Sequence, residues 1–336
     1  MRCKVWKNNA RIVVLVCVLL SLYGCGQGKK ETIRFFSMDT IMEITAYGDS
    51  GEALQQARDT IESLDAELNA ADPQSAVSKL QDGDLLPKTV LEPLQTAQAI
   101  AAQTNGALDL TLYPLSDAWG FYTKNYRVPS AKEIRSLMQT RGSFSVRNGV
   151  YSCADGTKLD LGSIAKGYAG DCAVETLRQN GVRSAILALG GNVQTLGCKP
   201  DGSDWIVSVA DPLLPEDTVC NLRVGETAVV TSGGYQRNFT EDDQTYHHIL
   251  SPQTGMPADS GLLSVTILSK DGAMADGLST ALFITGRNGL RELYDRHVFS
   301  FEALIITENR EIFFTNGLTD RVELTNETYA QPKLLQ

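Results

Sequence analysis

The stretch DGAMADGLSTALF, residues 271–283, is a run of small and apolar residues with two polar side chains set one helical turn apart. Asp276 and Thr280 are separated by four positions, so an α-helix places both on the same face. Burying an acid without a partner costs considerable free energy, so a compensating group is required. At this point, a hydrogen bond within the protein and a bound cation are both open.

The N-terminal residues have the features of a bacterial export signal. The basic segment MRCKVWKNNAR precedes the apolar segment IVVLVCVLLSLYG, and Cys25 follows directly. The apolar run is shorter than the roughly 20 residues that commonly span a bilayer. Leu22, Gly24 and Cys25 resemble a lipobox, which implies cleavage before Cys25 and acylation of its thiol, with palmitate as one of the chains. An ordinary signal peptide with an incidental cysteine is the alternative.

Composition narrows the class of protein. The chain has 336 residues, of which 43% are hydrophobic, and a formal net charge of −10. This composition is typical of a globular core, and the acidic balance argues against a nucleic-acid partner. An acyl anchor at Cys25 would hold the protein on the extracytoplasmic side of the cell membrane.

The later cysteines do not form a recognisable metal motif. None belongs to a CxxC pair, and no histidines lie at zinc-binding spacing, so a thiolate metal site is not expected. Disulfides remain open because an exported protein meets oxidising conditions. The cysteines concerned are Cys153, Cys172, Cys198 and Cys220.

The periodicity predicts an α+β domain with mostly antiparallel strands. Asn148-Gly149 indicates a hairpin, and residues 106–122 have the composition of a shaped loop. Two β-rich runs flank residues 38–40. Helices are expected over 51–69, 89–103, 130–140, 164–180, 273–285 and 288–296. Further strands are expected over 184–189, 205–210, 218–224, 226–231, 246–250, 262–269, 301–306 and 311–315.

The segment LDLGSIAKGYAGD, residues 159–171, places polar groups at the start of a predicted helix. Asp160 ends a strand, and the helix begins near Ile164. Free amides at a helix N-terminus bind anions such as phosphate, and Lys166 could contribute charge there. The competing interpretation makes Ser163 an N-cap and Lys166 a solvated side chain.

Two further groups have candidate chemistry. His248, in YHHILSPQTGMP (246–257), lies at the end of a predicted strand, before a turn, so it could contact a ligand or simply pack. Asp276 and Thr280 offer only oxygen atoms, which suit magnesium because this ion keeps waters and shares its shell with phosphates. Alternatively, Asp276 caps its helix and Thr280 bonds back to a carbonyl.

Taken together, these segments resemble the FAD:protein FMN transferases, the ApbE flavin-transferase family, over roughly residues 33–315. The resemblance rests on several motifs in consistent order. These are MDT (38–40), GALDLTLYPLSDAWGF (106–121), LDLGSIAKGYAGD (159–171), ALGGN (188–192), TSGGYQRNF (231–239), HILSPQTG (248–255) and MADGLSTALF (274–283).

The resemblance implies a single T-fold-like α+β domain, with FAD as substrate and Mg²⁺ as cofactor. Enzymes of this family move FMN from FAD to a threonine of another exported protein and release AMP. Residues 1–24 are then the lipoprotein signal peptide, residues 25–31 the acylated N-terminus and tether, and residues 32–336 the flavin-transferase catalytic domain.

The resemblance also assigns residues to the site. The metal ligands fall on Asp276, Thr280 and Ser163, the last through its backbone carbonyl. The expected FAD contacts are Met38, Ala107, Leu108, Asp109, Asp160, Lys166 and Ile249. A threonine hydroxyl is a weak nucleophile, and His248 has the more suitable pKa for a general base since Asp276 is committed to the metal.

Two positions depart from the family pattern. Ala71 stands near where the family often has an aromatic residue, so one wall of the flavin pocket is expected to differ. Ser251 stands where an aspartate is usual before the proline, which leaves the role of that acid open.

Three other functions remain in competition. The same site with water as acceptor would make the protein an FAD pyrophosphatase that yields FMN and AMP. A lipoprotein that binds FAD without turnover would not need the Asp276/Thr280 pair. A purely structural surface lipoprotein would leave the polar motifs without a purpose.

Overall fold

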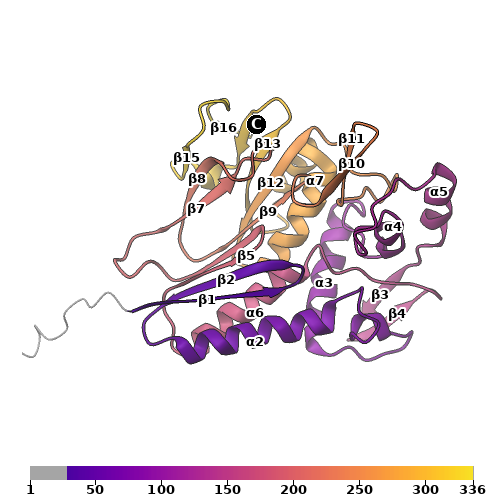
Figure 1. The fold of residues 1–336 in the computed structure, drawn as a ribbon, viewed down its shortest axis with the longest axis horizontal. Coiled ribbons are helices and arrows are strands. Elements are labelled where there is room, and N and C mark those ends of the chain that lie inside the picture. Colours follow the sequence, from indigo (N-terminus) through magenta and orange to yellow (C-terminus); the bar gives the residue numbers. More distant parts are fainter. Residues whose placement is uncertain (1–28, 336) are drawn as a thin grey trace, which may run out of the picture.

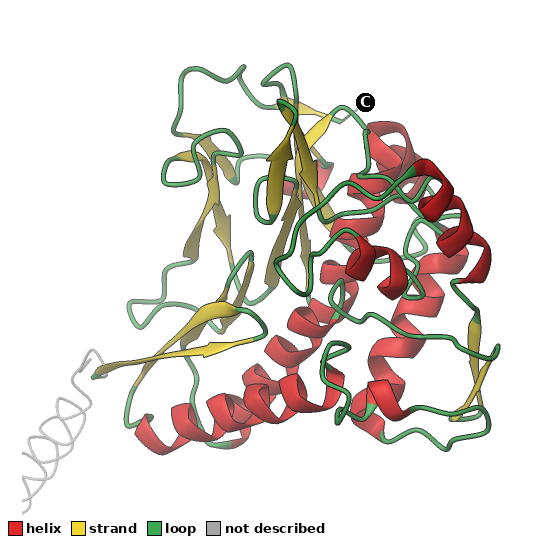
Figure 2. Ribbon diagram, turned by 45° about the vertical axis from the view of Figure 1, so that its right-hand side comes forward, coloured by secondary structure: helices red, strands yellow, loops and turns green. Residues whose placement is uncertain are grey.

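The computed structural model describes residues 29–335, which form a large sheet with helices on one face and a small sheet on the other (Figure 1). Figure 2 shows the helices gathered on one side of the large sheet. The expected signal peptide and the acylated Cys25 lie outside the described residues.

The large sheet confirms the predicted α+β class with mostly antiparallel strands. Its order is β1-β2-β5-β6-β9-β12-β13-β14-β16, and only β14 and β16 run parallel. Its strands are β1 (Lys30–Ser37), β2 (Thr40–Tyr47), β5 (Ala185–Leu189), β6 (Asn192–Leu196), β9 (Ala228–Gly233), β12 (Leu262–Ser269), β13 (Glu302–Thr307), β14 (Ile312–Phe314) and β16 (Lys333–Leu334).

Smaller sheets complete the strand set. The small sheet that covers the second face of the large sheet has the order β15-β8-β7, and two hairpins stand apart from both. These strands are β7 (Trp205–Ala210), β8 (Thr218–Val224), β15 (Val322–Leu324), β3 (Phe144–Arg147), β4 (Val150–Cys153), β10 (Asn238–Glu241) and β11 (Gln244–His247).

The helices follow the predicted periodicity closely. In α2 the buried side chains include Leu54, Ile61 and Leu64, which recur at helical spacing and face the core. The helices are α2 (Gly51–Leu68), α3 (Lys88–Gln103), α4 (Tyr113–Ala118), α5 (Ala131–Thr140), α6 (Ala165–Gln179) and α7 (Gly272–Asp295).

Apolar side chains form two principal cores, one on each face of the large sheet. Met42, Ile44 and Leu187 belong to the core beneath the helices. Trp205 and Leu222 of the small sheet pack with other apolar residues on the opposite face. Burial on both faces explains why the central strands are nearly continuous apolar runs.

The structure corrects three details of the prediction. Residues 106–122 are not entirely loop, because they contain the short helix α4. The two helices expected at 273–285 and 288–296 form one element, which bends at Gly286, where φ is 72°. Strands β6, β10, β15 and β16 were missed because each is only two to five residues long.

The β1–β2 hairpin turns through Met38 and Asp39, whose φ values are 48° and 59°. Two residues with positive φ match a type I′ turn, which suits the twist of a hairpin. The carboxylate of Asp65, on α2, accepts hydrogen bonds from the Ser37 hydroxyl at 2.9 Å and the Met38 N–H at 2.7 Å. This contact fixes the tip of the hairpin over the end of α2.

Helices α6 and α7 cross at two glycines without side chains between them. A Cβ added to Gly167 would lie 2.1 Å from the carbonyl oxygen of Gly272 and 2.7 Å from Cβ of Asp276. The carboxylate of Asp171 binds the two helices together by accepting the N–H groups of Gly272 and Ala273, each at 2.9 Å. The start of α7 is therefore positioned by α6.

We predict that Gly167→Ala destabilises the protein, although alanine is about 1 kcal/mol more favourable than glycine within a helix. The added methyl group overlaps backbone of α7, so the free energy of unfolding should fall by about 3 kcal/mol. Urea unfolding of Gly167→Ala and of Gly225→Ala measures this. A Cβ at Gly225 meets nothing within 4 Å, so an equal loss in both variants would contradict the packing argument.

Candidate functional site

One cavity of about 950 Å³ opens where the tip of the β1–β2 hairpin, the end of α2 and the crossing of α6 and α7 meet. We call it the main cavity. It brings together every described residue that the sequence assigned to the site. These are Met38, Ala107, Leu108, Asp109, Asp160, Ser163, Lys166, His248, Ile249, Asp276 and Thr280.

Asp276 does not cap its helix. The N-cap of α7 is Asp271, whose side chain accepts the N–H of Met274 at 2.8 Å. The carboxylate of Asp276, 5% exposed, instead accepts the N–H of Gly167 on α6 at 2.8 Å. Burial raises its pKa, and the charge of Lys166 and the Gly167 N–H oppose this rise. A cation beside Asp276 would relieve the cost of its ionisation.

Thr280 lies one turn further along the same face of α7. Its hydroxyl is 3.4 Å from the hydroxyl of Ser232, which lies 2.7 Å from that of Ser279. In residues 29–335, no hydrogen bond joins the Thr280 side chain to a carbonyl of its own helix. The back-bonding interpretation is therefore wrong, and the hydroxyl remains available to the main cavity.

The start of α6 is open on its cavity side. The helix begins at Ala165 after Ile164, and no side chain caps it, so the N-cap interpretation of Ser163 is wrong. Asp160 accepts the N–H of Gly162 at 2.8 Å and fixes the turn before the helix. Lys166 reaches back to within 3.4 Å of the Gly162 carbonyl. The N–H groups of Ile164, Ala165, Gly167 and Tyr168 are already bonded, so within residues 29–335 the N–H groups of Ser163 and Lys166 and this ammonium group remain available to an anion.

His248 is held as a neutral imidazole. Its Nδ1 lies 3.1 Å from the carbonyl oxygen of Arg237. Because a carbonyl oxygen only accepts, Nδ1 carries the proton and Nε2 keeps a free lone pair. Burial, assisted by the positive charges of Arg237 and Lys166, lowers the pKa of His248 to about 3. The ring is therefore an unprotonated acceptor over the physiological pH range.

Comparison with known proteins is consistent with this geometry. The sequence profile of the ApbE family matches residues 38–305. A relative from Klebsiella pneumoniae (strain 342), named FAD:protein FMN transferase, is 35% identical over 236 residues, which cover 68% of this chain and 72% of the relative. One from Treponema pallidum (strain Nichols), with the same name, is 28% identical over 354 residues and covers 95% of this chain and 97% of its own.

The chain belongs to the ApbE family.

Solved structures show the same fold. The ApbE protein from Thermotoga maritima MSB8 superimposes with a TM-score of 0.79 at 29% identity, covering 87% of this chain and 99% of its own. The apo form of the Pseudomonas stutzeri flavinyl transferase ApbE gives a TM-score of 0.73 at 30% identity, covering 84% and 92%. The fold expected from the sequence resemblance is thus confirmed.

The donor set of this ApbE protein fits magnesium. Asp276 offers a carboxylate in the main cavity and Thr280 a hydroxyl, while Ser163 lines the same cavity. No group of three or more His, Cys, Asp or Glu side chains able to hold a metal occurs within residues 29–335. A sparse oxygen set suits an ion that keeps several waters, and does not suit zinc or a closed calcium cage.

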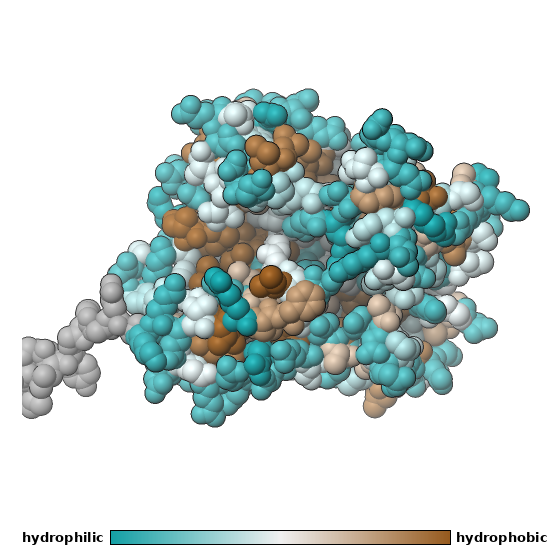
Figure 3. All heavy atoms as spheres, viewed as in Figure 1, coloured by the Kyte–Doolittle hydropathy of each residue, from teal (hydrophilic) through white to brown (hydrophobic). Residues whose placement is uncertain are grey.

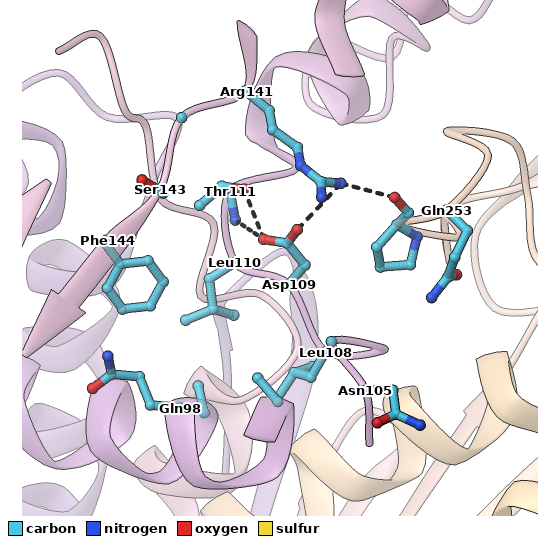
Figure 4. Close-up of a pocket in the computed structure, with 15 residues that line it drawn as sticks. Gln98, Asn105, Leu108, Asp109, Leu110, Thr111, Arg141, Ser143, Phe144 and Gln253 are labelled. Atoms are coloured by element: carbon cyan, nitrogen blue, oxygen red, sulfur yellow. Dashed lines mark hydrogen bonds and ion pairs between the residues drawn. The ribbon is translucent and has the colours of Figure 1, made fainter. Parts of the chain in front are cut away.

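Asp109 stands in a wall between the main cavity and a second cavity of about 550 Å³. One oxygen of Asp109 accepts the N–H and the hydroxyl of Thr111 at 2.9 and 2.7 Å. The other oxygen lies 3.3 Å from the guanidinium of Arg141, which also donates to the carbonyl of Pro252 at 2.8 Å (Figure 4). These contacts leave Asp109 little freedom to turn.

The two departures from the ApbE pattern have different consequences. Ala71 lines the main cavity, and aromatic side chains from other segments, among them Tyr122 and Tyr126, line it too. The turn at Ser251 forms without an acid, because the serine hydroxyl accepts the N–H of Gln253 at 3.3 Å and its own N–H donates to Met256 at 2.8 Å.

Sequence reasoning missed several residues of the main cavity. Asp39 pairs with Lys124 at 3.2 Å and with Arg237 at 2.8 Å, which joins three distant segments at the cavity mouth. Lone charges in loops give no sequence signal for such pairing. Tyr122 was also missed, and burial raises the pKa of its hydroxyl well above the usual value, an effect that neighbouring Asp160 reinforces.

Asn192 is the most informative of the missed residues. It lines the main cavity and is 0% exposed, yet neither polar atom of its amide has a hydrogen-bond partner within residues 29–335. Asn192 shares a face of β6 with Gln194, whose amide donates to the Gly167 carbonyl at 2.9 Å. An orphaned amide beside the Gly167–Asp276 contact indicates a partner supplied by a ligand, an ion or water.

We predict that Asn192→Leu, which has the same number of side-chain heavy atoms, leaves the melting temperature of the free protein unchanged or raises it. Replacing an unpaired buried amide by an apolar group removes a desolvation penalty. The dissociation constant for FAD, the ligand expected from the sequence, should rise by about tenfold or more.

The matched control is Ser264→Ala, because the Ser264 hydroxyl is equally buried and unpaired but does not line the main cavity. Titration calorimetry and thermal melts compare the two variants. Unchanged FAD affinity in Asn192→Leu, or an equal loss in Ser264→Ala, would show that the amide does not meet the ligand.

Proposed function

We propose that this enzyme is a magnesium-dependent FAD:protein FMN transferase that attaches FMN through a phosphoester bond to a threonine of an exported acceptor protein and releases AMP. Membership of the ApbE family and the names of its relatives support the transferase activity. The magnesium requirement and the threonine acceptor rest on the chemistry of the main cavity and on the family resemblance.

One observation carries the proposal. The carboxylate of Asp276 is buried, has a raised pKa and accepts only the Gly167 N–H among residues 29–335, one turn from the Thr280 hydroxyl. Such a group is expensive in a free protein and favourable beside a cation. It lies at the start of α6, where amides and Lys166 favour a diphosphate.

Different side chains of the main cavity have different roles in the transfer. Amides at the start of α6 and the ammonium of Lys166 stabilise negative charge that grows on the non-bridging oxygens of the diphosphate. Magnesium, held by Asp276, Thr280 and Ser163, would neutralise further charge there when bound. Met38, Ala107, Leu108, Asp109, Asp160 and Ile249 line the cavity in which FAD is expected.

The reaction is balanced without a further reactant. Nε2 of His248 accepts the proton of the acceptor hydroxyl while the hydroxyl oxygen forms a bond to the phosphorus of the FMN half. The anhydride bond breaks, and its electron pair leaves with AMP. The low pKa of His248, about 3, keeps Nε2 unprotonated and also makes it a weaker base than an ordinary imidazole.

Hydrolysis of FAD is the second candidate function, since water in place of the threonine breaks the same bond. Nothing in the main cavity excludes water. An FAD-binding lipoprotein without turnover is the third, and the cation-ready Asp276/Thr280 pair argues against it. Release of AMP distinguishes binding from turnover, and attachment of FMN to protein distinguishes transfer from hydrolysis.

We predict that Asp276→Asn lowers AMP release and acceptor flavinylation by orders of magnitude, because the change removes a charge from the metal site. Thr280→Val, which lacks only the hydroxyl, should reduce both in the same direction and less severely. The melting temperature of Asp276→Asn should hold or rise, since a buried carboxylate without its ion is destabilising. Each variant is assayed across a magnesium titration and melted separately.

Removal of magnesium by excess chelator should stop turnover of the wild-type enzyme. Adding magnesium back should restore it. Near-normal activity of Asp276→Asn with unchanged magnesium dependence would reject the metal assignment. Full activity of the wild-type enzyme in chelator would remove the metal from the reaction altogether.

We further propose that Cys25 is acylated and that the enzyme acts on the extracytoplasmic side of the cell membrane. Within residues 29–335, no helix combines the length and apolarity needed to cross a bilayer. Cys25→Ala should move the protein from the membrane fraction to the soluble exported fraction or stall its processing. An unprocessed cytoplasmic protein would contradict this location.

A further inference from the structure

Large apolar side chains are exposed close in sequence to residues that line the main cavity. The exposed fractions are 67% for Phe36 and 72% for Ile41, on the β1–β2 hairpin, and 46% for Leu213 and 53% for Leu214, in the β7–β8 loop. We call these four residues the mouth surface. Clustered apolar exposure of this kind marks contact sites more often than scattered single residues do.

Both parts of the mouth surface adjoin the cavity directly. Phe36 pairs with Ile41 across the hairpin, and the turn between them, Met38 to Thr40, lines the main cavity. Leu213 and Leu214 precede Pro215, which lines it as well. Figure 3 shows apolar side chains over the β1–β2 hairpin in the middle of this face.

Two glycines hold the hairpin turn against the β5–β6 turn. Gly190 and Gly191 line the main cavity and connect β5 to β6. A Cβ added to Gly190, whose φ is 73°, would lie 3.1 Å from the hydroxyl of Thr40. The Met38–Asp39 turn is therefore packed closely against the cavity wall.

The outer edge of β1 is free among the described residues. β1 pairs only with β2, and Ser37 lies opposite Thr40 at the two-residue turn. Ser37 and Thr40 form a hydrogen-bonded pair, and hydrogen-bonded and non-hydrogen-bonded pairs alternate along an antiparallel ladder. The N–H and C=O groups of Arg34 and Phe36 therefore point away from β2. An exposed row of such groups is a template for an added strand.

Charged side chains beside the mouth surface are held in ion pairs. Arg34 forms an ion pair with Glu43, and Asp39 pairs with both Lys124 and Arg237. One positive charge is left in excess, so an acidic residue is not disfavoured here, and apolar contact and backbone hydrogen bonds supply the rest of the recognition.

We propose that the mouth surface and the edge of β1 dock the acceptor protein, through an extended segment whose apolar side chains flank the target threonine. The segment adds to β1 beside Arg34 and Phe36 and carries its threonine past the Met38–Asp39 turn into the main cavity. This inference rests on the proposed transferase function and names the chemistry of its second substrate.

Transfer requires a polypeptide at this mouth while FAD fills the cavity, which favours the acceptor as occupant. The N-terminal segment joins the described chain at Lys29, whose carbonyl accepts the N–H of Gly48 at 3.0 Å. At about 3.3 Å per residue, that point lies about 23 Å from Phe36, at the far end of β1. If the N-terminal segment or a second copy of the chain occupies the mouth surface instead, the variants below will change membrane attachment or oligomeric state and not peptide binding.

The probe is a synthetic peptide of about ten residues, one strand in length, with a central threonine flanked by leucine and valine. A second peptide replaces the flanking residues with serine. The full-length protein with FAD should bind the apolar peptide, by fluorescence polarisation, at least about tenfold more tightly than the serine-substituted one. Equal binding, or no binding of the apolar peptide, would overturn the proposal.

Two double variants test the surface. Phe36→Ser with Ile41→Ser, and Leu213→Ser with Leu214→Ser, should each weaken peptide binding by about tenfold and raise the KM for peptide flavinylation. FAD affinity and AMP release without peptide should stay unchanged, which separates failure of docking from failure of the proposed function. The control is Leu85→Ser, because Leu85 is 77% exposed and lines neither cavity.

The backbone contribution is tested by Arg34→Pro against Arg34→Ala. Proline removes an N–H that points away from β2, so only this variant should weaken peptide binding. Thermal melts confirm that both variants fold. Equal effects of the two substitutions, an equal loss in Leu85→Ser, or serine variants that change only membrane attachment or oligomeric state would reject acceptor docking.

Discussion

The contact between the Gly167 N–H and the Asp276 carboxylate, at 2.8 Å, is the interaction on which the site depends. It exists because glycine lets the backbones of α6 and α7 meet, and because Asp171 holds the first turn of α7 from the α6 side. The acid is thereby fixed in a buried position where its pKa is raised. The fold thus presents a carboxylate whose ionisation favours a bound cation.

The remaining groups are arranged around that carboxylate by separate elements. The open start of α6 contributes amides and Lys166, and the carbonyl of Arg237 fixes His248 as a neutral base. Asp39 joins the cations of Lys124 and Arg237 at the mouth. The cavity is therefore assembled from segments that are distant in sequence.

Sequence patterns predicted the helices well because α2, α3 and α6 have one apolar face each, and 3.6-residue periodicity reports burial directly. The fold class and the family followed from ordered motifs. The sequence did not reveal the bend at Gly286 or the short helix α4, since a single glycine and a six-residue segment carry little periodic signal. The roles of individual cavity residues remain predictions.

Tertiary pairing explains the other omissions. Asp276 was weighed as a helix cap, but capping falls to Asp271, and only the crossing of α6 and α7 supplies Gly167 as partner. The orphaned amide of Asn192 was invisible for the same reason, because satisfaction of a polar group depends on neighbours distant in sequence. The order of the motifs identifies the site residues as a group, but their individual hydrogen-bond partners are known only from the structure.

Mass spectrometry of an exported acceptor protein, incubated with this enzyme, FAD and magnesium, tests the central claim most directly. The account predicts a mass gain equal to one phosphoester-linked FMN on a threonine, with one AMP released for each FMN attached, and neither product with Asp276→Asn. An unmodified acceptor with free FMN and AMP in solution would contradict transfer and identify the enzyme as an FAD pyrophosphatase.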